Sequence, residues 1–177
     1  STVELVCGLN EMESTDGSAL PVQYGGLSAE LKPNDPILIA DGLIRMVVVQ
    51  TPGTPNSTVT CRVEDGGPVS SRKGVNVPGT LVELPAIGPK DEKAMAHALE
   101  QGADYIAVSY VRTAEDLIPA KNAVKAASMH VPIIAKIEHP SALVNLDSIL
   151  NVADAVMVAR GDLGVEIPLE DVPMAQQ

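Results

Sequence analysis

The chain has 177 residues, of which 45% are hydrophobic and 20% are charged, and its net charge is −11. This length and hydrophobic content allow one large domain or two small ones with a packed core. Only 2% of the residues are aromatic, with no Trp or Phe. An acidic chain with so few stacking rings is not expected to bind nucleic acid, so any phosphate site has to be local.

The two cysteines, Cys7 and Cys61, are far apart in the sequence and suit a reducing compartment, although the sequence leaves a single disulfide between them open. Because no apolar run reaches the length of a membrane span, we expect neither a membrane partner nor a secretory leader. The expected location of this globular, soluble chain is therefore the cytoplasm.

Residues 1–73 carry the pattern of short β-strands. Apolar runs occur at residues 3–7, 36–40, 43–49 and 58–63. Asp41-Gly42 lies between the second and third runs, and Asp-Gly in this position is a strong hairpin signal. We predict a compact all-β module here. The segment 74–85, which contains several Pro and Gly residues, is predicted to be a hinge and a return into a second domain.

Residues 86–177 alternate between helical and strand patterns. Helices are predicted from Pro89 to Gly102, from Thr113 to about Ser128, around Leu146, Ile149 and Leu150 with Ser141 or Asn145 as cap, and over 169–177; short buried strands are predicted at 105–108, 133–135 and 155–158. Thr113 and Asp116 have the spacing of a capping box. This alternation favours parallel βαβ crossovers and an α/β fold.

Charged residues follow the last two predicted strands directly. Lys136 and Glu138 lie two positions apart and would point the same way, and a neighbouring parallel strand about 4.8 Å away would bring Asp162 close to them. Chemistry in such sheets gathers at the carboxyl ends of the strands. Two carboxylates suit a hard divalent cation such as Mg²⁺, and the lysine would offset charge on a phosphoryl group. The alternative is an ordinary ion pair with Asp162 capping a turn, but the three together favour a site.

Four strings now support a family resemblance. These are KIE (136–138) and MVARGDLGVEIP (157–168), with GGPVSSRKGVNVPG (66–79) and ADYIAVSYVR (103–112) before them. Together they resemble pyruvate kinase, in the order of that family. The resemblance implies a partial (β/α)₈ TIM barrel, strands four to six, in residues 86–177, with residues 1–73 as the inserted all-β lid domain. The chain is similar to only the middle of such an enzyme.

The resemblance implies phosphoryl transfer from phosphoenolpyruvate to ADP, giving pyruvate and ATP in glycolysis. Lys136 would then be the catalytic residue, stabilising the transferring phosphoryl group and the enolate oxygen. Glu138 and Asp162 would hold Mg²⁺ or Mn²⁺. Backbone N–H groups of Arg160, Gly161 and Asp162 would bind the substrate carboxylate, because Gly161 lets the main chain come close.

Nucleotide contacts are implied for three residues of the first part. Asp41 matches a family position near the nucleotide and its metal, although Asp is also a residue that turns prefer. The family usually has a second acidic residue just before it, where this chain has Ala40. Arg72 and Lys73, beside a glycine, would meet the phosphates, with solvated surface charge as the alternative.

The strand end before the lysine matches the family motif with one change. Ser109 and Arg112 are expected to be structural supports, and Tyr110 replaces the usual Phe. A second change lies after the lysine, where His139, next to Glu138, replaces the usual Asn. In the complete family enzyme, other strands carry the K⁺ ligands, an arginine for the phosphate and a threonine beside the transferring group. The resemblance therefore implies K⁺ dependence and a homo-oligomer, a tetramer in the complete enzyme, while the chain by itself is expected to be inactive.

Two other functions are considered. A metal-dependent aldolase of the pyruvate and phosphoenolpyruvate barrel group also places a Glu and an Asp at successive strand ends, but it needs neither a nucleotide lid nor the lysine of KIE. A non-catalytic remnant would keep the metal and ligand site without turnover. Pyruvate formation from phosphoenolpyruvate, measured with and without ADP, separates the three possibilities.

Overall fold

The computed structural model describes residues 1–9 and 18–177 and consists of two compact units, Ser1–Glu83 and Leu84–Gln177. The boundary lies near the end of the predicted hinge rather than at its start. Residues 74–83 belong to the first unit because Val75 pairs with Ile39 of the sheet and Val77 is buried in the core. The predicted hinge is thus mostly part of a folded unit.

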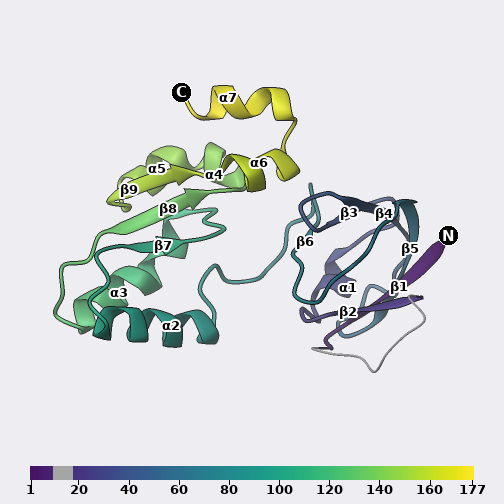
Figure 1. Ribbon diagram of the computed structural model, residues 1–177, viewed down its shortest axis with the longest axis horizontal. Coiled ribbons are helices and arrows are strands. Elements are labelled where there is room, and N and C mark those ends of the chain that lie inside the picture. Colours follow the sequence, from purple (N-terminus) through teal and green to yellow (C-terminus); the bar gives the residue numbers. More distant parts are fainter. Residues whose placement is uncertain (10–17) are drawn as a thin grey trace. The chain divides into compact units, whose positions relative to one another are not determined.

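The first unit is built around a six-stranded sheet (Figure 1). Its elements are β1 (Thr2–Cys7), β2 (Ala19–Val22), α1 (Leu27–Glu30), β3 (Pro36–Ile39), β4 (Ile44–Gln50), β5 (Thr58–Asp65) and β6 (Val75–Asn76). The strand order is β2-β1-β5-β4-β3-β6, with β1 and β2 parallel and the other pairs antiparallel. The short helix α1 is an addition to the predicted all-β module.

Alternation along the strands gives this unit its core. Every second side chain of β1 and β4 is buried, which is the period expected for a sheet with one packed face. Both cysteines lie in this core as free thiols, so the open alternative of a disulfide is not the form seen in the structure. Burial, followed by the nearby Cys7, raises the pKa of Cys61 to about 11. Both the burial and this pKa keep the thiol unreactive at neutral pH.

The predicted Asp-Gly hairpin is confirmed between β3 and β4, which pair antiparallel and end at Ile39 opposite Ile44. Three successive residues of the turn, Ala40, Asp41 and Gly42, have φ values of 54°, 58° and 85°. Asp and Gly tolerate this left-handed region, whereas Ala40 takes it at a cost. The turn therefore presents the Asp41 side chain from a defined, exposed position.

The second unit contains a three-stranded parallel sheet in the order β7-β8-β9 (Figure 1). Its elements are α2 (Pro89–Glu100), β7 (Ile106–Val108), a 3₁₀ turn η1 (Ala114–Leu117), α3 (Ile118–Ala126), β8 (Ile133–Ile137), α4 (Pro140–Val144), α5 (Leu146–Leu150), β9 (Ala155–Val158), α6 (Arg160–Glu166), a second 3₁₀ turn η2 (Leu169–Asp171) and α7 (Val172–Ala175). The predicted parallel βαβ connections are confirmed.

Helix boundaries agree with the sequence at most ends. α2 begins at Pro89 and is followed by Gly102 at φ 78°, the left-handed position that favours glycine after a helix. The helix predicted from Thr113 divides into η1 and α3 and ends at Ala126. The single helix predicted after β8 is two short helices joined at Asn145.

Helices cover one face of the parallel sheet and leave the other open. Ile133, Ala135 and Ile137 of β8 are almost fully buried in a core that they share with α2 and α3. On the opposite face Ala107 and Met157 are exposed, in register with the two sides of β8. Parallel strands with helices outside and a bare inner face fit part of a (β/α)₈ barrel. In the part of the chain described, no helix has the length and apolar character to cross a membrane.

An acidic side chain ties the strands of this sheet together at their amino ends. Asp154 accepts a hydrogen bond from the Ile133 N–H at 2.7 Å and pairs with Lys121 Nζ at 2.6 Å. The backbone bond, followed by Lys121, lowers the pKa of Asp154 below its usual value. The ionised form is therefore favoured by folding.

Asp154→Ala should destabilise the second unit by about 1 kcal/mol at neutral pH, because it leaves the Ile133 N–H without its acceptor. The exposed ion pair with Lys121 adds little, so Lys121→Met should cost less. Since the folded pKa is depressed, the advantage of the wild type should be complete above about pH 4 and disappear as the pH falls further. Hydrogen exchange of the β8 amides measures the difference, and an equal effect of both variants would contradict this assignment.

Candidate functional site at the carboxyl ends of the parallel strands

Lys136 and Glu138 meet at the carboxyl end of β8, as the alternation along the strand predicts. The Lys136 ammonium lies 2.5 Å from Glu138 Oε1 and donates to Ser109 Oγ, at the end of β7, at 3.0 Å. Strands β7 and β8 are neighbours in parallel register, which is why residues 27 positions apart converge. A quarter of the Lys136 side chain is exposed. It is therefore held in place and still accessible.

Glu138 is a buried carboxylate, only 2% exposed. Its Oε2 accepts the Tyr110 backbone N–H at 2.8 Å, while Oε1 faces Lys136. A charge this deeply buried is stable only with such partners. Each oxygen has a second lone pair, so the carboxylate keeps capacity for a further cation or donor.

Arg160, Gly161 and Asp162 form the first turn of α6, directly after β9. All three are exposed. Among residues 1–9 and 18–177, Asp162 forms no ion pair and no side-chain hydrogen bond, neither with Lys136 or Glu138 nor with any other residue. The predicted convergence thus holds for the lysine and the glutamate, while Asp162 presents free oxygens to solvent from the next strand end.

His139 has a structural contact that suits its place at the start of α4. Its Nδ1 accepts the Ser141 N–H at 3.1 Å, so the imidazole caps the helix in its neutral form. Burial lowers the pKa of His139, Arg112 adds to this, and Glu166 opposes it. Its ring lies 6.1 Å from that of Tyr110.

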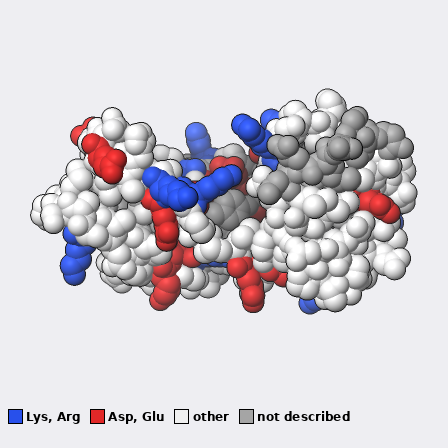
Figure 2. All heavy atoms as spheres, turned by 90° about the horizontal axis from the view of Figure 1, so that it is seen from below, with Lys and Arg blue, Asp and Glu red and all other residues white. Residues whose placement is uncertain are grey.

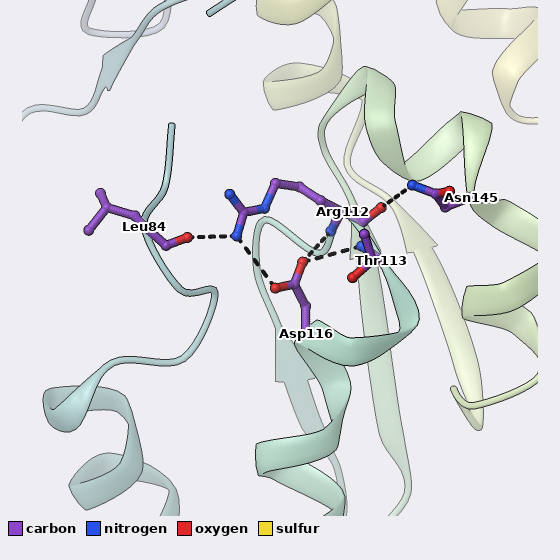
Figure 3. Close-up of polar contacts among 5 residues, drawn as sticks. All are labelled: Leu84, Arg112, Thr113, Asp116 and Asn145. Carbon is purple, nitrogen blue, oxygen red and sulfur yellow. Dashed lines mark hydrogen bonds and ion pairs between the residues drawn. The ribbon is translucent and has the colours of Figure 1, made fainter. Parts of the chain in front are cut away.

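Arg112, expected to be a structural support, lies in a dense local network (Figure 3). Its Nη2 donates to the Leu84 carbonyl at 2.6 Å and lies 3.4 Å from Asp116 Oδ1. Asp116 Oδ2 accepts the backbone N–H groups of Arg112 and Thr113, and Asn145 Nδ2 donates to the Arg112 carbonyl at 3.0 Å. The network ties the segment before α2 to the turn after β7, which fixes the loop that contains Ser109 and Tyr110.

In the first unit, two of the predicted nucleotide segments lie side by side. The Ala40 N–H, next to Asp41, donates to the Gly74 carbonyl at 3.2 Å. Arg72 and Lys73 directly precede Gly74 and are exposed, with Arg72 at φ 63°. An exposed carboxylate and two cationic side chains therefore share one edge of this unit.

The described residues contain no group of three or more His, Cys, Asp or Glu side chains placed to hold a metal ion. Mg²⁺, however, needs only one or two carboxylates and completes its shell with water and substrate oxygens. The donors at hand are hard oxygens, one carboxylate held by buried contacts and one free in solvent. Their chemistry fits such an ion.

Nearly the whole chain is similar to known proteins. Residues 2–177 match the model of the family described as "Pyruvate kinase, barrel domain". The chain belongs to the pyruvate kinase family. It is 46% identical over 158 residues to a pyruvate kinase of Agrobacterium vitis. These residues make up 89% of this chain and 32% of that protein. It is 42% identical over 176 residues to the pyruvate kinase of Corynebacterium efficiens, and these residues make up 99% of this chain and 35% of that protein.

A pyruvate kinase of Geobacillus stearothermophilus is 41% identical over 175 residues, which cover 98% of this chain and 30% of the relative. The chain thus spans about a third of the length of these curated pyruvate kinases. The resemblance found in the four sequence strings is confirmed at the level of the family. The family model covers both units of the structure.

The surface of this pyruvate kinase family member agrees with its composition. Figure 2 shows both acidic and basic side chains at the surface in this view. With a net charge of −11, any phosphate site has to depend on a few local cations.

Sequence reasoning did not find Glu166, whose Oε1 accepts the Tyr110 hydroxyl at 2.8 Å, and did not assign Tyr110 a role. Tyr110 has φ 56°, a region that a tyrosine rarely adopts and that no local pattern predicts. Tyr110 is 36% exposed, so its hydroxyl could equally bond to water, and the sequence contains no signal for the Glu166 contact.

Proposed function

We propose that this chain is the central part of a pyruvate kinase and supplies the core of its phosphoryl-transfer site. The observation that carries the proposal is the Lys136 ammonium, paired with a buried carboxylate and accessible at the carboxyl ends of two parallel strands. The family membership supports phosphoenolpyruvate and ADP as substrates. Active sites of barrels with this architecture lie at that end.

Lys136 is proposed to act on the transferring phosphoryl group. Ser109 and Glu138 hold its ammonium in one place, so little reorganisation is needed when negative charge develops on the substrate. In the folded state, the ion pair with the buried Glu138 offsets the free energy of holding the Lys136 ammonium in one place. Positioning and electrostatics of this kind provide most of the catalysis in phosphoryl transfer.

Glu138 and Asp162 are the proposed ligands of Mg²⁺ or Mn²⁺. A divalent cation bound there would neutralise charge on phosphoryl and carboxylate oxygens. Glu138 contributes a preorganised carboxylate, and Asp162 a free one at the next strand end. The backbone of Arg160 and Gly161, at the start of α6, is proposed to bind the substrate carboxylate.

The first unit is proposed to be the lid domain that contacts ADP. Asp41, Arg72 and Lys73 are the proposed contacts, supported by the hydrogen bond that brings their two segments together. K⁺ is proposed as a further cofactor whose ligands lie on other parts of the complete enzyme, together with its oligomer contacts.

The test of the activity is pyruvate formation from phosphoenolpyruvate by the complete protein that carries this chain, with and without ADP. A pyruvate kinase forms pyruvate only when ADP is present. Release of pyruvate and inorganic phosphate without ADP would show hydrolysis instead of transfer to the nucleotide, and binding without turnover in either condition would favour a non-catalytic protein.

The metal assignment makes a separate prediction. Glu138→Gln and Asp162→Asn should each weaken Mn²⁺ binding at least several-fold in the absence of nucleotide, because each removes one anionic ligand. Asp41→Asn is the matched control, an equally small change on the first unit, and should leave this affinity unchanged. Free Mn²⁺ is measured by electron paramagnetic resonance. Equal losses in all three variants would show that Asp41 has been assigned wrongly.

A further inference from the structure

Helix α6 has few means of holding its position. It is seven residues long and follows β9, an edge strand whose Val156 and Met157 are 39% and 45% exposed. Leu163 is the buried residue of the helix. A helix with so small an apolar face needs a polar anchor to keep one orientation.

Such an anchor lies at its last residue. Glu166 Oε1 accepts a hydrogen bond from the Tyr110 hydroxyl at 2.8 Å. Tyr110 follows β7, whereas α6 follows β9, so this bond spans the width of the three-stranded sheet. A carboxylate acceptor makes it stronger than a bond between neutral groups.

Tyr110 is itself firmly placed. Its backbone N–H donates to Glu138 Oε2 at 2.8 Å, and Glu138 is buried and paired with Lys136. Its φ of 56° persists only where surrounding contacts determine it. A continuous chain of contacts therefore runs from Lys136 through Glu138 and Tyr110 to Glu166.

We propose that Tyr110 is a positioning residue that holds α6 by its carboxyl end and thereby sets where the turn of Arg160, Gly161 and Asp162 lies relative to the Lys136–Glu138 pair. A single short helix moves as one body, so fixing Glu166 also restricts Asp162 in its first turn. The step to Asp162 as a metal ligand rests on the proposed function. The anchoring of α6 does not.

The anchor is tested by hydrogen–deuterium exchange of peptides covering α6 in the complete protein. Tyr110→Phe keeps the ring and removes the hydroxyl, and it should speed exchange of the Leu163 and Ile167 amides about 5-fold, the equivalent of one lost hydrogen bond of about 1 kcal/mol. Tyr105→Phe is the matched control, since Tyr105 is 62% exposed, and should leave α6 unchanged.

Glu166 supplies the second half of the test. Glu166→Gln keeps an acceptor oxygen but loses the charge, so its exchange should lie between that of the wild type and that of Tyr110→Phe, whereas Glu166→Leu should speed exchange at least as much as Tyr110→Phe. The double variant Tyr110→Phe/Glu166→Leu should be no worse than Glu166→Leu alone, because both changes remove the same bond. Additive effects, or unchanged exchange in Tyr110→Phe, would overturn the anchor.

Mn²⁺ titration then tests the positioning role and separates it from the proposed function. If Tyr110 places Asp162, Tyr110→Phe should weaken Mn²⁺ binding a few-fold and Glu166→Gln should weaken it less. Faster exchange in α6 with unchanged Mn²⁺ affinity would overturn the positioning role while leaving the metal site intact. Mn²⁺ binding that ignores Glu138→Gln and Asp162→Asn would instead overturn the proposed metal site, and the exchange result would still decide the anchor.

Discussion

Lys136→Met in the complete enzyme should lower kcat for phosphoryl transfer by roughly 10²–10³, or about 3–4 kcal/mol in the barrier, with a much smaller effect on substrate half-saturation. The reason is that the ammonium interacts most strongly with charge that develops in the transition state. In the structure Ser109 and Glu138 already hold the ammonium, so the variant loses a positioned charge.

The loss of the ion pair has to be separated from the loss of catalysis. Lys121→Met is a control for the loss of a paired lysine in the same unit, because Lys121 also pairs with a carboxylate, at 2.6 Å, but in a more exposed pair at the amino ends of the strands. It should keep nearly full activity. Steady-state kinetics with varied phosphoenolpyruvate and ADP make the comparison. A Lys136→Met enzyme with normal kcat and only a raised half-saturation would show that this lysine binds the ground state alone.

The regular parts of the fold could be predicted because their determinants are local. The apolar runs of β8 and β9 and the proline that opens α2 lie within the elements they define, and the glycine that follows α2 lies next to it. The Asp41-Gly42 hairpin is another such case, since two adjacent residues supply the left-handed turn. Period and turn chemistry are short-range properties, so a single sequence contains them.

Pairings between distant segments could not be predicted in the same way. The parallel pairing of β1 with β2 and the addition of β6 beside β3 depend on which edges remain free after other strands have paired. The boundary of the first unit followed β6, which moved it beyond the predicted start of the hinge. Such choices are made by the packing of the whole unit rather than by any one run of residues.

The candidate site shows the same division. Alternation placed Lys136 and Glu138 together, and parallel pairing brought Ser109 to them. The contacts of Tyr110 involve its own backbone N–H and a carboxylate 56 positions away, so neither has a local pattern. Arg112 was expected to support the site, but its partner, the Leu84 carbonyl, is a backbone atom that every residue possesses. Backbone acceptors leave no mark in a sequence.

The 177-residue chain by itself should show negligible pyruvate kinase turnover. Its parallel sheet has β7 and β9 as unpaired edges and one uncovered face, on which Met157 is 45% exposed. Three strands cannot close an eight-stranded barrel, and covering the inner face is worth roughly 25 cal/mol per Å² of apolar surface. Losing that burial over three strands removes several kcal/mol, comparable with the stability of a small domain.

The second unit of the isolated chain should therefore be loose or associate through its open edges, while the first unit, with a core of its own, should stay folded. Hydrogen exchange of the two units and sedimentation over a range of concentrations measure this difference. A coupled assay with phosphoenolpyruvate, ADP, Mg²⁺ and K⁺ measures turnover, with the complete enzyme as the positive control. A monomer of residues 1–177 that worked at ordinary enzyme rates would contradict both the incomplete barrel and the assignment of further site residues to other strands.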